Sequence, residues 1–212
     1  MNEIPNLLIG VAMGLNLLAL ASGRLPSLIR VAAVQGVVLG LLPLLMEKVD
    51  WLVVLVAVCS TALKGFVIPG LLRRAMRTAN IDRDLDPLIG FIPSLILGAA
   101  GTIAAVALAR MLPLLPEHRG LLLVPGSLAS IITGFVLLTS RSKAISQVCG
   151  YLILDNGIYL FGLLLIHAVP FMVEAGILLD LTVAVFVIGI IVDRIQRAFD
   201  TLDTRMLTTL RE

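Results

Sequence analysis

The chain has 212 residues, of which 59% are apolar and only 14% are charged, whereas soluble domains average about 45 to 50% apolar and about 25% charged residues. This composition excludes an ordinary soluble domain. The net charge of +2 also excludes a nucleic-acid-binding protein, which needs a strongly basic surface. The apolar residues recur in seven stretches of about 19 to 25 residues, each able to cross about 30 Å of hydrocarbon as a helix. We therefore predict an all-α bundle of seven transmembrane helices.

Turn residues and short charged runs separate the predicted helices. In chain order the helices cover about residues 4–22, 28–46, 51–72, 88–110, 120–139, 144–166 and 172–192. After the last of them, Ile195, Phe199 and Leu202 share one face of an amphipathic helix. We divide the chain into three parts on this basis: a four-helix membrane segment at 1–112, a three-helix segment at 113–192 and a cytoplasmic tail at 193–212.

The basic residues give the predicted orientation. Twelve of the 16 Lys and Arg residues fall on one side of the seven-helix arrangement and three on the other, with Lys64 in mid-helix. Cytoplasmic loops carry the excess of basic residues, so we place the N-terminus outside and the C-terminus in the cytoplasm.

Small residues at four-residue spacing recur in three helices and predict close helix contacts. The residues are Gly10 and Gly14, Gly36 and Gly40, and Gly126, Ser130 and Gly134. The alternative is that glycine is simply common in membrane helices.

Three ionisable residues lie inside the predicted helices: Lys64, Asp155 and Asp180. Each costs about 2.5 to 3.5 kcal/mol to insert at a helix centre unless it is paired or neutralised. Lys64 lies about 20 Å along its helix from Trp51, and Asp155 about 16 Å from Ala144, at 1.5 Å per residue. Both therefore lie near mid-membrane. Since one lysine can neutralise only one carboxylate, the other can take up and release a proton, which is the property of a proton relay.

Other polar groups surround these charges. Four side chains at i, i+4 spacing line one face of the helix at 144–166: Gln147, Tyr151, Asp155 and Tyr159. Asn156 lies beside them, and this stripe can hold ordered water. The alternatives are ordinary interhelical hydrogen bonds for the stripe, and a Lys–Asp pair that only fixes helix register for the charges.

The helix that carries Lys64 contains two further signals. Ser60 lies one turn before Lys64. Pro69 has no N–H and leaves the carbonyl of Gly65 without its helical partner, so we expect a local kink beside the lysine.

The two cysteines, Cys59 and Cys149, fall in separate apolar stretches and form no CxxC pair. We expect both to be inert, buried thiols. Metal and iron–sulfur sites need several thiolates or imidazoles at close spacing, so the sequence predicts no metal site and no cofactor.

Four segments together are similar to a known family. The segments at 139–147 (TSRSKAISQ) and 154–160 (LDNGIYL) resemble the second helix of the small three-helix subunits of respiratory complex I and of multisubunit cation/proton antiporters. The segments at 62–69 (ALKGFVIP) and 179–187 (LDLTVAVFV) resemble the longer hydrogenase-4 component E. The resemblance covers essentially the whole chain.

This resemblance implies a non-catalytic membrane subunit of a group 4 nickel-iron hydrogenase, such as a formate hydrogenlyase, in the inner membrane of a prokaryotic cell. Its partners would be antiporter-like subunits, a subunit like the H subunit of complex I and, indirectly, the hydrophilic hydrogenase arm. Asp155 matches the first proton-relay acid of the family and Asp180 the second. The complex I subunit usually has glutamate at the first position, and aspartate is one methylene shorter.

Two other functions remain open at this point. In the first, the chain moves ions itself, as a subunit of a cation/proton antiporter or as a stand-alone transporter. Many transporters contain inverted repeats, and the sequence shows no evident inverted repeat. The chain would be a structural spacer if the complex needed it only for assembly.

Overall fold

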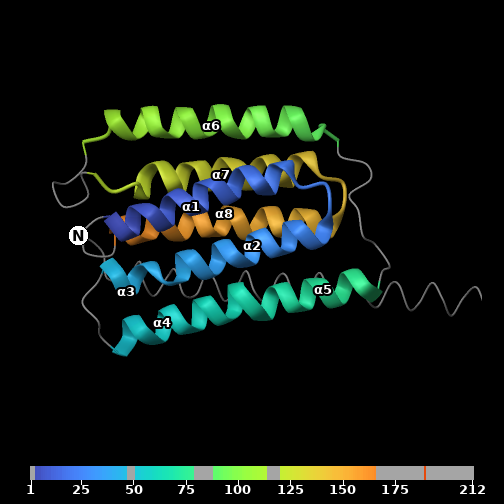
Figure 1. Ribbon diagram of the computed structural model, residues 1–212, viewed down its shortest axis with the longest axis horizontal. Coiled ribbons are helices and arrows are strands. Elements are labelled where there is room, and N and C mark those ends of the chain that lie inside the picture. The colour runs from blue at the N-terminus through green and yellow to red at the C-terminus, as the bar shows by residue number, and fades with distance from the viewer. Residues whose placement is uncertain (1–2, 47–50, 79–87, 114–119, 166–188, 190–212) are drawn as a thin grey trace, which may run out of the picture.

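A computed structural model describes residues 3–46, 51–78, 88–113, 120–165 and 189. Every regular element in these ranges is helical, as Figure 1 shows. Five helices of the described part are long and apolar enough to cross a membrane, which confirms the all-α membrane class. Apart from Gly189, the predicted helix at 172–192 and the tail at 193–212 lie outside the described residues.

The helix bounds follow the predicted stretches closely. The elements are α1 (Glu3–Ala21), α2 (Leu25–Gly40), α3 (Leu42–Met46), α4 (Trp51–Ala62), the π-helical turn η1 (Leu63–Val67), α5 (Ile68–Thr78), α6 (Phe91–Met111), α7 (Leu123–Ser140) and α8 (Ala144–Leu165). The second helix begins earlier than predicted because Pro26 lies in its first turn, where no backbone N–H is needed. The third extends to Thr78 instead of 72, because the segment after Pro69 continues as an amphipathic helix.

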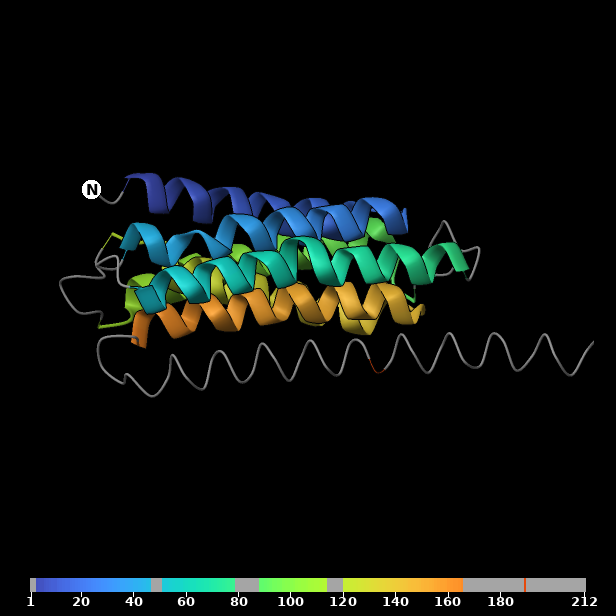
Figure 2. The ribbon, with the colours of Figure 1, turned by 90° about the horizontal axis from the view of Figure 1, so that it is seen from below.

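The helices lie side by side along one axis (Figures 1 and 2). The helices α1, α2, α7 and α8 contact one another in the middle of the bundle. At one edge α6 packs on α7 and α1, and at the opposite edge the rod formed by α4, η1 and α5 packs on α2. These edge helices leave much of their apolar surface facing outward, as in a bundle surrounded by lipid.

The closest helix contact joins α7 to α8 and depends on glycine. A Cβ added to Gly134 would lie 2.6 Å from the backbone nitrogen of Leu154 and 2.7 Å from the backbone oxygen of Gly150. Such distances are too short for any side chain, so the two backbones can approach only through glycine. This confirms the predicted packing role of Gly134.

The two other glycine pairs differ in whether another helix lies close to them. Gly36 and Gly40 of α2 also face a close neighbour, the segment from Thr61 to Lys64, which confirms the prediction for that pair. Gly10 and Gly14 of α1 have no neighbour within 4 Å of an added Cβ. The prediction of a close helix contact is therefore wrong for that pair within the described part of the chain, because both residues face away from the bundle.

The interior contains two apolar clusters. One gathers residues of α1, α2, α5, α7 and α8 near the end of the bundle where α1 and α7 end, and includes Leu20, Ile29 and Leu72. The other gathers residues of α1, α2, α3, α7 and α8 toward the opposite end, and includes Ile9 and Leu160. On each long helix of the centre, the positions between the two clusters carry buried polar side chains. The core is therefore apolar at both ends and polar at half its length.

Candidate functional site

The site begins with a widened turn in the rod at the edge of the bundle. In η1 the backbone N–H of Ile68 donates to the carbonyl of Leu63, five residues earlier. Pro69 follows directly and cannot supply the N–H that would bond to Gly65 in a regular α-helix. The kink predicted from Pro69 is thus found as a π-helical turn, a feature frequent at functional sites.

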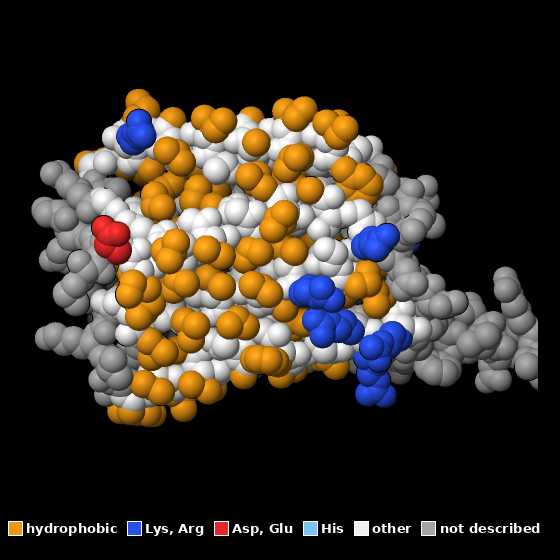
Figure 3. Space-filling view, in the orientation of Figure 1, with side chains coloured by type: hydrophobic (Ala, Val, Ile, Leu, Met, Phe, Trp, Pro, Cys, Tyr) orange, Lys and Arg blue, Asp and Glu red, His pale blue; other side chains and the backbone are white. Residues whose placement is uncertain are grey.

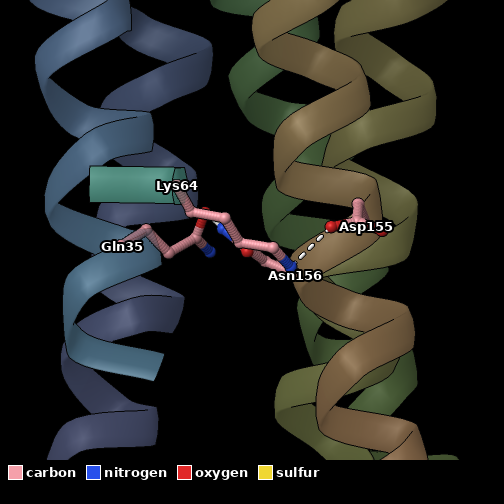
Figure 4. Close-up of polar contacts among 4 residues, drawn as sticks. All are labelled: Gln35, Lys64, Asp155 and Asn156. Carbon is pink, nitrogen blue, oxygen red and sulfur yellow. Dashed lines mark hydrogen bonds and ion pairs between the residues drawn. The ribbon is translucent and has the colours of Figure 1, made fainter. Parts of the chain in front are cut away.

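Lys64 lies in this turn and reaches into the middle of the bundle. Its Nζ lies 2.6 Å from Oδ2 of Asp155 on α8, and the two residues are only 5% and 2% exposed. Figure 4 shows the lysine side chain crossing from η1 to α8. Gly36 makes room for this crossing, because a Cβ there would lie 2.8 Å from Cβ of Lys64.

The pair lies in the polar layer between the two apolar clusters. Removal of two charges from water is expensive, and only close pairing offsets that cost. Lys64 is also held by a ring, since its Nζ lies 5.1 Å from the ring centre of Tyr159, within the range of a cation–π interaction. The structure therefore brings together three of the predicted site residues.

A chain of amide and hydroxyl groups continues from the residue next to Asp155. Asn156 Nδ2 donates to Gln35 Oε1 at 3.4 Å, and Gln35 Nε2 donates to Asn16 Oδ1 at 2.8 Å. Asn16 Nδ2 in turn donates to Ser130 Oγ at 2.9 Å. The chain joins α8, α2, α1 and α7 at one level of the bundle, and Figure 4 shows its Gln35–Asn156 link beside the ion pair.

Sequence reasoning missed Asn16 and Gln35. Both are fully buried, and a buried amide in an otherwise apolar helix is the signal that could have identified them, because it must find a hydrogen-bond partner. Ser130 was noted only as a small packing residue. Its hydroxyl instead ends the amide chain.

The remaining predicted residues lie around the pair or away from it. Ser60 is buried one turn before Lys64. Tyr151 is partly buried against the apolar cluster near the end of α1. Gln147 Nε2 donates to the backbone oxygen of Arg141 at 3.0 Å, at the end of the bundle. Asp180 lies outside the described residues.

Arg141 is a second buried charge, which the sequence assigned only to a basic turn between helices. It is fully buried, and its Nη2 donates to the carbonyl of Leu20 at 2.8 Å. Its guanidinium carbon lies 4.4 Å from the ring centre of Phe91. Because Leu20 is in the last turn of α1, where the helix dipole is negative, a cation is favoured there. Arg141 thus fastens α1 and α6 to the turn before α8.

The described part of the chain contains no group of three His, Cys, Asp or Glu residues placed to hold a metal ion. Cys149 is buried as predicted, but the prediction is wrong for Cys59, which is exposed. Cys59 follows Val58 on the outward face of α4, and apolar exposure of this kind is normal for a lipid-facing helix.

Sequence comparison relates the chain to two groups of proteins. It is 35% identical over 191 residues to an uncharacterized protein of Mycobacterium tuberculosis, which covers 89% of this chain and 87% of that relative. It is 29% identical over 150 residues to hydrogenase-4 component E of Escherichia coli and of Shigella flexneri, which covers 70% of this chain and 68% of each relative. No family model matches the chain, and no solved structure gives a significant match.

Proposed function

We propose that the chain, which belongs to the same family as the Mycobacterium tuberculosis protein, is an integral membrane subunit of a complex-I-like group 4 hydrogenase or formate hydrogenlyase. The proposal starts from its distant relationship to hydrogenase-4 component E. The apolar helices fit a membrane subunit. In this proposal the chain performs no redox chemistry itself and contributes one step of proton transfer along the membrane part of the complex.

One observation carries the proposal: the Lys64–Asp155 ion pair at half the length of the bundle. A buried pair is a poor means of stabilising a protein, since apolar side chains of similar volume usually do as well or better. Intramembrane ionisable residues more often mark ion pathways and proton relays. A proton delivered to the Asp155 carboxylate would neutralise it and release the Lys64 ammonium from the pair. Transfer of that proton from Asp155 to the next acceptor along the path would restore the carboxylate and its pair with Lys64.

The surrounding groups suit this role. The amide chain through Gln35 and Asn16 fixes Asn156, the neighbour of Asp155 along α8. The ring of Tyr159 already lies within cation–π distance of the Lys64 ammonium and would still stabilise it when the carboxylate is neutral.

Several finer assignments belong to the same proposal. Asp180 would be the second acid of the relay, and Gln147, Tyr151 and Ser60 would supply polar groups along the path. The basic end of the bundle would face the cytoplasm, as the positive-inside rule requires. Neighbouring antiporter-like subunits would deliver and accept the proton. The parts at 1–112 and 113–192 would act together, since Lys64 belongs to the first and Asp155 to the second.

The test is the Asp155→Asn variant in the assembled complex. We expect proton pumping to be lost while the complex still assembles, because asparagine has nearly the same shape but cannot hold a proton for transfer. A control is Thr102→Val on α6, whose hydroxyl donates to the carbonyl of Gly98 in the same helix at 2.8 Å. Near-normal pumping by the Asp155→Asn complex would contradict the proposal.

A lone Lys64 could prevent assembly of that variant. The double variant Lys64→Met/Asp155→Asn removes both charges and is expected to assemble without pumping. Normal pumping by the assembled double variant would instead favour a structural spacer. Cation flux through liposomes that contain only this purified chain would favour a transporter.

A further inference from the structure

Asp155 is the acid of the bundle interior among the described residues. The other described acid, Glu3, begins α1 at one end of the bundle. In Figure 3 hydrophobic side chains cover the middle of the visible face, and the charged side chains lie toward its two ends. A cation attracted to half the length of the bundle therefore meets one carboxylate within the described part of the chain. Which cation that carboxylate accepts decides which ion the site can carry.

The ammonium group of Lys64 fills the place beside Asp155. Its Nζ lies 2.6 Å from Oδ2, and carboxylate oxygens contact a hard cation such as Ca²⁺ at about 2.3 to 2.6 Å. Na⁺ has nearly the radius of Ca²⁺, so a sodium ion bound on this side of the carboxylate would have to lie where Nζ lies. Two cations cannot share the position, because like charges in contact repel strongly in an apolar interior.

Lys64 is held at this level by contacts at both ends of its side chain. Its Cβ packs against α2 at Gly36, where an added Cβ would lie 2.8 Å away. At the other end, the ring centre of Tyr159 lies 5.1 Å from Nζ, and the face of an aromatic ring attracts a cation whether or not the carboxylate is charged. Lys64 is therefore a tethered cation that stays in the polar layer in both states of Asp155.

The oxygens of the amide chain in the same layer already accept hydrogen bonds. Hard cations are held by a shell of several carboxylate, carbonyl and water oxygens. Gln35 Oε1 accepts from Asn156, Asn16 Oδ1 accepts from Gln35, and Ser130 Oγ accepts from Asn16. A sodium ion would have to displace these N–H donors or lie against them, and both are unfavourable for a cation.

The net charge of the pair disfavours sodium in both states of the proposed relay. When Asp155 is ionised, its charge and that of Lys64 cancel. When Asp155 is protonated, the ammonium leaves a single positive charge. A lone carboxylate, which would attract sodium, therefore arises in neither state. A proton needs no shell of oxygens, because it enters by forming one O–H bond on the carboxylate.

We propose that Lys64 determines the ion specificity of the site: it fills the place of a sodium ion beside Asp155, so that the site takes up protons and excludes sodium. The inference rests on the proposed function and names the ion that the relay carries. It also implies that removal of the lysine charge converts the surroundings of Asp155 into a sodium site.

The experiment measures thermal unfolding of the full purified chain in detergent, in NaCl and in choline chloride of equal ionic strength. An alkaline pH is used so that protons compete less with sodium for the carboxylate. We expect the unaltered chain to unfold at the same temperature in both salts. Lys64→Met should unfold about 4 °C higher in NaCl, the shift for a ligand at about ten times its dissociation constant. Lys64→Met/Asp155→Asn, which lacks the carboxylate, should unfold equally in both.

Three results would overturn the proposal: stabilisation of the unaltered chain by sodium, no difference between the salts for Lys64→Met, or an equal sodium response in the double variant. If Lys64→Met unfolds during purification, its refolding yield in the two salts gives the same comparison. Proton pumping by the assembled Asp155→Asn complex is a separate measurement. It decides whether the relay exists, whereas the salt comparison decides which cation the site admits.

Discussion

The Lys64–Asp155 pair makes a quantitative prediction about stability, because its two charges are buried together. Three variants test it: Lys64→Met, Asp155→Asn and the double variant. Methionine keeps the length and apolar stem of lysine without its charge, and asparagine keeps the shape of aspartate. Each single variant leaves one charge in the apolar interior without its partner, whereas the double variant leaves none.

The expected magnitudes follow from the cost of an uncompensated buried charge. Removal of one member of a buried ion pair typically costs about 3 to 5 kcal/mol, whereas replacement of both members is often neutral or stabilising. With Nζ and Oδ2 only 2.6 Å apart, the single variants should each reach that range. The double variant should lie within about 1 kcal/mol of the unaltered chain, which gives a coupling energy of several kcal/mol.

The assay is reversible unfolding of the full chain in bicelles or mixed detergent, with the four proteins compared under identical conditions. A double variant that loses as much stability as the two single variants together would show that the charges act independently and would refute the reasoning. Losses below about 1 kcal/mol in both single variants would mean that each charge reaches water without its partner, which would also refute it.

Three other predictions concern the residues that hold the helices around the pair. Gly134→Ala should destabilise the fold by about 1 to 3 kcal/mol because its Cβ meets the backbone of α8, whereas Gly10→Ala, with no neighbour within 4 Å, should be neutral in the same unfolding assay. Gln35→Leu should cost about 1 to 2 kcal/mol by breaking two interhelical hydrogen bonds, and an undiminished stability would contradict the amide chain. Arg141→Lys should cost about 2 kcal/mol, since an ammonium cannot reproduce the planar contact with Phe91, and proteolysis at the turn before α8 should increase.

Hydropathy and helical rise alone predict that Lys64 and Asp155 lie at mid-membrane depth, and in the structure the two meet between the two apolar clusters, at half the length of the bundle. Depth is a local property, because 1.5 Å per residue and the two ends of an apolar stretch fix how far along the helix each side chain lies. The same local chemistry located the break at Pro69, where a missing N–H must disturb the helix whatever surrounds it. These predictions did not depend on which helices are neighbours.

The partners of those residues depended on the tertiary structure. Whether Lys64 meets Asp155, whether Gln35 bonds to Asn16 and whether Cys59 faces outward all depend on how each helix is rotated and which helix lies beside it. An apolar helix is nearly uniform around its circumference, so its sequence scarcely encodes that rotation. The rotation is set instead by close contacts of small residues and by buried polar groups that must find one another. The sequence therefore determined the membrane bundle and the level of its charges, and only the packing of the helices decided which groups meet at that level.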